Sequence, residues 1–166
     1  MSRLAFLSPD QAAPEVALVS PLARVLAGAD PRVVRDLSLL GKVEVHGDLD
    51  LVGLEPGEEL VRLAPRRGLV LREGSTASAR ERFGAAGFLV FDRTAAYAAV
   101  ELRGETLLRR LTDLDLDALP AVGGLARGVQ AIVLRLDADT FRVLVPQELG
   151  HYVCEVVLDV SEGLSS

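Results

Sequence analysis

The sequence predicts an α+β fold built from two β-rich halves that resemble each other. Three observations support this expectation. A short aspartate–hydroxyl motif occurs twice, an alternating strand that ends at a glycine follows each copy, and each half continues with a hairpin and a helix. The chain has 166 residues, which suits one domain or two small halves with a common core. Its 49% hydrophobic and 25% charged residues are typical of a globular protein and argue against disorder.

The first 32 residues are expected to form an irregular arm and one short helix. Two prolines interrupt the beginning of the chain, with a short extended piece predicted over 16–19. Ser20 followed by Pro21 is a typical helix start, because serine caps the first turn and proline fits the first helical position. Gly28 ends this predicted helix.

The repeated motif reads apolar-x-Asp-x-(Ser/Thr). The first copy contains Asp36 and Ser38, and the second contains Asp92 and Thr94. The alternating strands that follow are Val43-Glu44-Val45 and Val100-Glu101-Leu102. Because two patterns recur in the same order, duplication explains them better than chance does.

Each half then continues with matching elements. The predicted elements are hairpins over 59–72 and 132–145 and helices over 76–84 and 146–160. The second half has an additional amphipathic helix over 105–114 and a turn-rich connector over 115–124. We therefore expect pseudo-repeats over about 33–84 and 88–160, followed by a tail over 161–166.

The alternating strands and the helices also predict the core. Val43, Val45, Val100 and Leu102 should point into one core shared by the two halves. Leu111 in the additional helix and Val153 in the last helix should be buried, because each lies on an apolar stripe.

Charge and cysteine content exclude several classes of protein. The formal net charge is −6, Lys42 is the only lysine, and the paired arginines have no interleaved aromatics, so we expect no nucleic-acid partner. No apolar run approaches the ~18 residues that span a bilayer, and the apolar run over 4–7 is too short for a secretory signal. Cys154, the only cysteine, excludes an internal disulfide and fits a reducing compartment. These observations predict a cytoplasmic protein with no membrane partner.

The sequence offers no complete metal-binding pattern. Asp113, Asp115 and Asp117 are spaced like the start of a calcium loop, but Ala118 and Gly124 stand where that loop needs glycine and glutamate. We expect a solvated helix end there.

The two histidines each have a carboxylate four residues later, which is half a metal site. His151 with Glu155 is predicted to form a helix-surface ion pair, and His46 a solvated strand end. Asp50, four residues after His46, should lie beyond a turn.

A catalytic constellation is also absent from the sequence. Asp36 and Asp92 each precede a hydroxyl residue by two positions, which local hydrogen bonding in a turn explains without catalysis. Cys154 lies beside the apolar stripe of the last helix and is predicted to be a core residue rather than a nucleophile.

Several phrases of the chain together resemble a known family. They are Phe91-Asp92-Arg93-Thr94, Val100-Glu101-Leu102-Arg103-Gly104, Leu114-Asp115-Leu116 and Asp139-Thr140-Phe141-Arg142-Val143-Leu144-Val145-Pro146. They resemble the folate-binding domain family of the glycine cleavage T protein (aminomethyltransferase) and heterotetrameric sarcosine oxidase, over about residues 33–160. The gamma subunit of sarcosine oxidase is closest in length and pattern. The resemblance implies an internally duplicated α+β fold with two interlocked β-rich halves.

The departures from the family bear on activity. Catalytic members carry paired aspartates before the strand that here starts near Ile132, where this chain has Gln130-Ala131, and an asparagine where it has Pro146-Gln147. The resemblance therefore implies a non-catalytic gamma-type subunit of a sarcosine oxidase-like amine oxidase. Such a subunit packs against larger subunits that carry the cofactors, and it binds none by itself.

Two other functions remain open at this point. The chain is alternatively a free-standing tetrahydrofolate-binding protein related to aminomethyltransferase, acting in one-carbon transfer. In that case Asp92 and Gln130 are the candidate folate contacts. The third reading is a structural duplicate that forms homodimers. No catalytic or metal-ligating residue is assigned.

Overall fold

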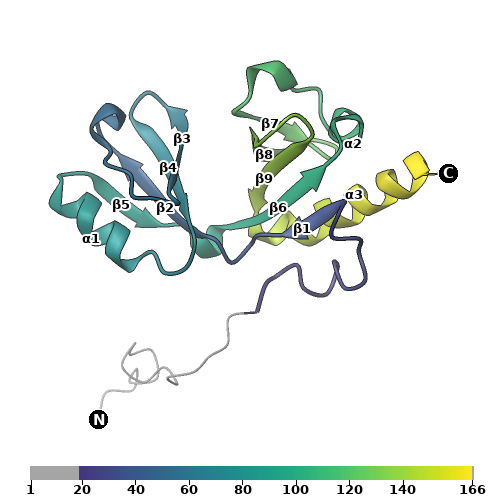
Figure 1. Cartoon of the computed structure of the whole chain (residues 1–166), viewed down its shortest axis with the longest axis horizontal. Coiled ribbons are helices and arrows are strands. Elements are labelled where there is room, and N and C mark those ends of the chain that lie inside the picture. The colour runs from purple at the N-terminus through teal and green to yellow at the C-terminus, as the bar shows by residue number, and fades with distance from the viewer. Residues whose placement is uncertain (1–18, 166) are drawn as a thin grey trace, which may run out of the picture.

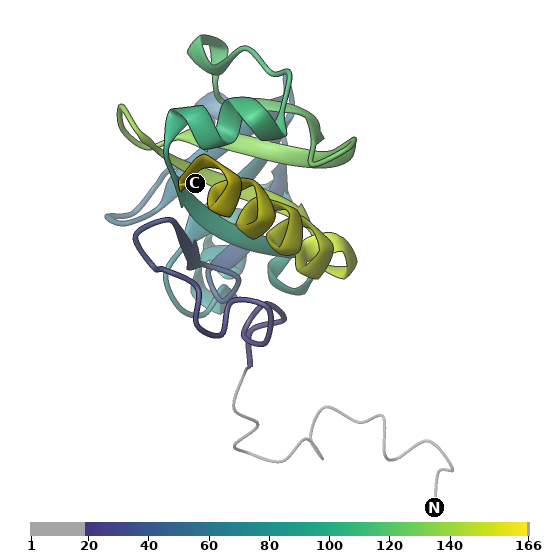
Figure 2. The same ribbon diagram turned by 90° about the vertical axis from the view of Figure 1, so that its right-hand side faces the viewer.

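Two antiparallel sheets pack face to face, and helices cover their outer faces (Figure 1). The computed structural model describes residues 19–165. Helix α1 covers the outer face of a four-stranded sheet, whereas α2 and α3 lie on the outer face of a five-stranded sheet (Figures 1 and 2). Figure 2 shows α3 crossing that sheet with α2 beside it. The expected α+β class is therefore confirmed.

The strands and helices have the following bounds. The strands are β1 (Val34–Asp36), β2 (Gly41–His46), β3 (Glu59–Ala64), β4 (Arg67–Arg72), β5 (Leu89–Asp92), β6 (Tyr97–Arg103), β7 (Ala121–Leu125), β8 (Val129–Arg135) and β9 (Thr140–Pro146). The helices are α1 (Ala77–Ala85), α2 (Glu105–Leu111) and α3 (Gly150–Ser165). The strand order is β3-β4-β2-β5 in one sheet and β1-β6-β9-β8-β7 in the other.

The two sheets exchange their edge strands. Strand β1 lies early in the chain but pairs with β6, and every other strand of that sheet follows residue 96. Strand β5 directly precedes β6 but pairs with β2 in the four-stranded sheet. Each sheet therefore contains one strand from the part of the chain that builds the other sheet.

The core consists of three clusters rather than one. Val43 and Val45 pack toward α1, whereas Val100 and Leu102 pack toward α2 and α3. All four are buried as expected, but the prediction of one core shared by them is wrong. They point to the outer faces of their sheets. The cluster between the sheets uses other side chains, namely Val61, Leu69, Leu71, Ala99, Ile132, Leu134 and Leu144.

The hairpins, Leu111 and Val153 agree with the sequence prediction. Leu111 and Val153 are 6% and 1% exposed. Both predicted hairpins form, as β3–β4 and β8–β9. The helix that follows the second hairpin begins at Gly150 and continues to Ser165, within the segment that the sequence assigns to a tail.

Three local predictions are wrong. Residues 21–28 form turns rather than a helix, although the Ser20 hydroxyl accepts a hydrogen bond from the Leu22 amide at 3.1 Å, as a helix cap would. The expected connector over 115–124 contains strand β7. Helix α2 ends before Thr112, whose hydroxyl donates to the Gly124 carbonyl at 2.6 Å.

Two predictions concern the ends of the chain or its surroundings. The predicted arm, with its extended piece, lies outside the described residues except for Val19 and Ser20. Within residues 19–165, no helix has the length and apolar character that a membrane crossing requires.

Candidate functional site

The two copies of the aspartate–hydroxyl motif lie where the exchanged strands end. Asp36 ends β1 and accepts a hydrogen bond from the Ser38 amide at 2.9 Å. Asp92 ends β5 and accepts one from the Thr94 amide, also at 2.9 Å. Each predicted local turn is thus confirmed. Each carboxylate also accepts a hydrogen bond from a hydroxyl of a distant segment. Ser20 donates to Asp36, and Thr76 donates to Asp92.

The hydroxyls of these motifs bind the other half of the chain. The Ser38 hydroxyl accepts from the Ala99 amide at 3.2 Å, and the Thr94 hydroxyl accepts from the Lys42 amide at 3.1 Å. The intervening amides behave alike, since Leu37 donates to the Ala99 carbonyl at 2.8 Å and Arg93 to the Lys42 carbonyl at 2.7 Å. The first motif therefore bonds the β1–β2 connector to β6, and the second bonds the β5–β6 connector to β2.

Lys42 lies fully buried between the two motifs. Its ammonium group donates to the carbonyls of Ser38 and Leu40, each at 2.8 Å, and reaches that of Thr94 at 3.5 Å. Burial lowers the pKa of Lys42 to about 8, although the charges of Asp36 and Asp92 act in the opposite direction. The hydrogen bonds of Lys42 thus stabilise the β1–β2 connector from its buried side.

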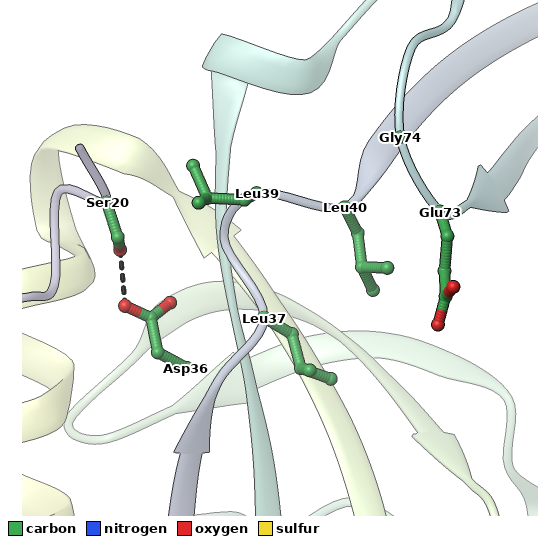
Figure 3. Close-up of a pocket in the computed structure, with 7 residues that line it drawn as sticks. All are labelled: Ser20, Asp36, Leu37, Leu39, Leu40, Glu73 and Gly74. Carbon is green, nitrogen blue, oxygen red and sulfur yellow. Dashed lines mark hydrogen bonds between the residues drawn. The ribbon is translucent and has the colours of Figure 1, made fainter. Parts of the chain in front are cut away.

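That connector forms one wall of a cavity of about 400 Å³. Figure 3 shows the lining, which consists of Ser20, Asp36, Leu37, Leu39, Leu40, Glu73 and Gly74. Leu37 and Leu40 lie in the middle of the view, with the carboxylates of Asp36 and Glu73 at opposite ends (Figure 3). The cavity is therefore apolar in its centre and acidic at its ends.

A smaller cavity of about 120 Å³ continues from the first one and shares Leu40 and Glu73 with it. Its lining includes Glu59 of β3 and Arg142 of β9, which form an ion pair between the two sheets at 2.5 Å. The Arg142 Nε atom is buried and has no hydrogen-bond partner among the described residues. The two cavities together follow the line where the sheets meet.

The side chains that line the larger cavity determine which groups it can bind. The Ser20 hydroxyl in the larger cavity donates to Asp36, and neither histidine nor lysine belongs to the described lining to activate it as a nucleophile. The Asp36 carboxylate already accepts on both oxygens. Since the described lining of the larger cavity has carboxylates but no cationic group, this cavity suits an apolar group that carries an N–H donor or a positive charge.

The two candidate folate contacts lie in different sheets. Asp92 is in the four-stranded sheet, where burial would raise its pKa, but hydrogen bonds from Thr76 and Thr94 and the charge of Arg80 keep that pKa below its ordinary value. Gln130 is an exposed residue of β8 in the five-stranded sheet. Both oxygens of Asp92 thus accept hydrogen bonds from the protein, whereas Gln130 faces solvent.

The histidine and cysteine candidates lie elsewhere. His151 contacts Glu155 at 3.2 Å, as predicted for a helix-surface pair. His46 is a half-exposed strand end, and its ring contacts Glu44. Cys154 is buried, and burial raises the pKa of its thiol to about 12, so the predicted core role is confirmed.

The aspartate run lies on the surface of the second half. Asp115 accepts from the Asp117 amide at 3.0 Å and caps a short 3₁₀ turn. Asp50, the acid after His46, pairs with Arg62 instead. Within residues 19–165, no group of three or more His, Cys, Asp or Glu side chains is arranged to hold a metal ion.

The sequence did not reveal the buried charges of β2. Lys42 and Glu44 are 0% and 2% exposed, although the alternation predicts that they face solvent. Their face of the sheet is covered because β4, beside them, packs against the five-stranded sheet. The only available signal was the isolated position of Lys42 as the sole lysine of the chain.

Comparison with known proteins identifies the fold. No protein family model and no curated protein sequence matches the chain. The chain is similar to a chain of the heterotetrameric sarcosine oxidase from Corynebacterium sp. U-96 in complex with pyrrole 2-carboxylate. The TM-score is 0.74 at 16% identity, covering 90% of this chain and 97% of that chain.

A second similar structure is the glycine cleavage system aminomethyltransferase T from Bartonella henselae. The TM-score is 0.56 at 18% identity, covering 75% of this chain and 45% of the aminomethyltransferase. Identities this low establish the fold alone. The resemblance expected from the sequence is thus confirmed at the level of the fold, which this chain shares with a sarcosine oxidase chain and with part of an aminomethyltransferase.

Proposed function

We propose that this chain is a non-catalytic, gamma-type subunit of a heterotetrameric, sarcosine oxidase-like amine oxidase. One observation carries the proposal: the fold matches nearly the whole of one chain of such a heterotetramer, 97% of its length, but only 45% of the aminomethyltransferase. A chain of this size and fold therefore has a counterpart that works inside a larger assembly.

The chemistry of the cavity supports a role without catalysis. Its hydroxyl and one of its carboxylates bind each other, and the nearby Lys42 ammonium is occupied by backbone carbonyls. General acid–base or nucleophilic work needs a group that is free to exchange a proton with a substrate. These groups instead stabilise the junction of the two sheets.

The matched hydrogen bonds of the two motifs support an internal duplication. We propose that the pseudo-repeats span about 33–84 and 88–160 of one folate-binding-like domain over 33–160. Asp36 and Asp92, and likewise Ser38 and Thr94, make equivalent bonds in the two halves. On this view residues 1–32 precede the domain, and residues 161–166, of which 161–165 continue α3, follow it.

The proposal extends to cofactors and location. We expect the larger subunits of the complex to carry its cofactors, and this chain to bind no cofactor alone. Tetrahydrofolate is the ligand to test, because one similar structure is an aminomethyltransferase of the glycine cleavage system. The low cysteine content fits a cytoplasmic complex.

Co-expression tests the assembly. The tagged chain would be produced with the proteins encoded beside its gene and purified, and the mass of the complex and its flavin absorbance would be measured. We expect a stable hetero-oligomer that contains this chain and larger, flavin-bearing chains. A chain that purifies alone or as a homodimer, while the neighbouring proteins assemble without it, would contradict the proposal.

Calorimetry with tetrahydrofolate under anaerobic conditions tests the ligand. The isolated chain should bind with a dissociation constant no tighter than about 1 mM, roughly −4 kcal/mol, because both oxygens of Asp92 already accept hydrogen bonds from the protein. Micromolar binding that is lost in Gln130→Ala or Asp92→Asn, but kept in the control Asp117→Asn, would favour the tetrahydrofolate-binding alternative.

A further inference from the structure

A second group of polar side chains lies on the four-stranded sheet, away from the cavities. Its centre is the Glu44 carboxylate, which accepts from Arg67 Nε and from Arg93 Nε, each at 3.1 Å, and contacts the His46 ring. Phe91 lies beside them, 5.5 Å from the His46 ring and 5.6 Å from the Arg93 guanidinium. We call Glu44, His46, Arg67, Phe91 and Arg93 the arginine cluster.

The arginine cluster has more positive charge than Glu44 neutralises. Glu44 is the one carboxylate that pairs with either guanidinium in the described part of the chain. Each arginine uses Nε for this contact, so the terminal nitrogens remain available as donors. The carboxylate is 3% exposed, whereas the Arg67 and Arg93 side chains are 45% and 43% exposed. The buried Glu44 carboxylate thus holds the half-exposed guanidinium groups of Arg67 and Arg93 at the surface.

The Glu44 carboxylate is ionised near neutral pH. Burial alone would raise the pKa of Glu44, but the hydrogen bond from His46 and the charges of Arg67 and Arg93 outweigh it and lower the pKa. Since Glu44 keeps its charge, it continues to bind Arg67 and Arg93. Guanidinium groups pair well with a planar oxyanion such as a carboxylate.

Apolar surface adjoins these cations. Leu89 and Phe91 of β5 are 66% and 44% exposed and lie opposite His46 and Glu44 of β2, on the same face of the sheet. Along β4 this face is covered by the five-stranded sheet, but at β5 it is open. Strand β5 is also an edge strand, at the lower left of Figure 1, and its outer edge pairs with no strand within residues 19–165.

Such an edge is unusual for a chain that functions alone. Exposed edge strands normally carry charges or prolines, because large apolar side chains there promote association. Aromatic and arginine side chains together are the residues that dominate binding energy at protein interfaces. The combination therefore indicates a surface that another chain covers.

We propose that the arginine cluster and Leu89 form the docking surface for a larger subunit of the complex. The partner places an Asp or Glu carboxylate between Arg67 and Arg93 and an apolar side chain against Phe91 and Leu89. This inference rests on the proposed function. A second copy of this chain fits less well, because the arginine cluster holds two arginines and a histidine against one buried carboxylate and so offers no exposed carboxylate to its own copy.

Variants of the docking surface and matched control variants elsewhere on the surface test the proposal in the reconstituted complex. Leu89→Asp should raise the dissociation constant for the larger subunits by about 100-fold, and Arg93→Gln by about 10-fold with a weaker dependence on salt. Val122→Asp, at an exposed apolar residue of edge strand β7, and Arg32→Gln should change it by less than about 2-fold. Unfolding midpoints of the free variants show whether each one folds.

The outcomes separate this inference from the proposed function. If the wild-type chain joins no larger subunits, the proposed function fails and the docking surface fails with it. If the wild type assembles but Leu89→Asp and Arg93→Gln assemble equally well, the docking surface is wrong while the proposed function stands. If Leu89→Asp instead dissolves a homodimer and leaves the complex intact, a second copy is the occupant and the inference is overturned.

Discussion

Replacing Lys42 by methionine should remove a pH dependence of stability that the wild-type protein has at alkaline pH. Lys42 is fully buried, and burial lowers its pKa from 10.5 to about 8. Between these values the unfolded chain binds more protons than the folded one, so the free energy of unfolding rises with pH. The difference between the two pKa values corresponds to about 3 kcal/mol.

Denaturant unfolding at a series of pH values measures this effect. From pH 8 to 10.5 the wild type should gain about 3 kcal/mol relative to Lys42→Met. Cys154 acts in the opposite direction, because its raised folded pKa makes stability fall above pH 9, but both proteins contain it and the difference cancels. Parallel stability curves for the two proteins would refute the argument that burial holds the Lys42 pKa low.

Three further predictions concern packing. Leu111→Ala should lower the free energy of unfolding by about 2–4 kcal/mol, and Val153→Ala should lower it somewhat less. Urea titration measures both changes. An unchanged unfolding midpoint would mean that Leu111 does not pack in the core. Gly150→Ala should lower the melting temperature, because its Cβ would lie 2.6 Å from that of Ala98. Gly163→Ala in the same helix meets open space and should raise it, and equal shifts would contradict this. The Cys154 thiol should react with a disulfide reagent only after unfolding.

Local patterns predicted what local forces decide. The turns after Asp36 and Asp92 follow from a two-residue spacing, and their backbone hydrogen bonds form as expected. The hairpins follow from alternation on both sides of a turn. In contrast, β1 has three residues and β5 four, too few for a periodic pattern to distinguish them from loop.

Features that depend on distant partners were not predicted. Alternation showed that Val43 and Val45 share a face, but it did not show that α1 would cover them. Alternation also places Lys42 and Glu44 on the opposite face, but it did not show that a second sheet would cover that face. The cavity is assembled from three segments that lie far apart in sequence, so no single motif could indicate it.

The exchange of edge strands makes the chain resemble a domain-swapped dimer whose two partners are joined covalently. A cut between α1 and β5 would leave one fragment with β1 but without β6, and the other with β5 but without β2. Neither fragment could complete its sheet, whereas a mixture of both could. During synthesis, the four-stranded sheet likewise cannot be completed until residue 92 has been made. Strand β1 cannot pair until β6 has been made, which is later still. The residues of β1 therefore lack their partner strand until β6 has been made.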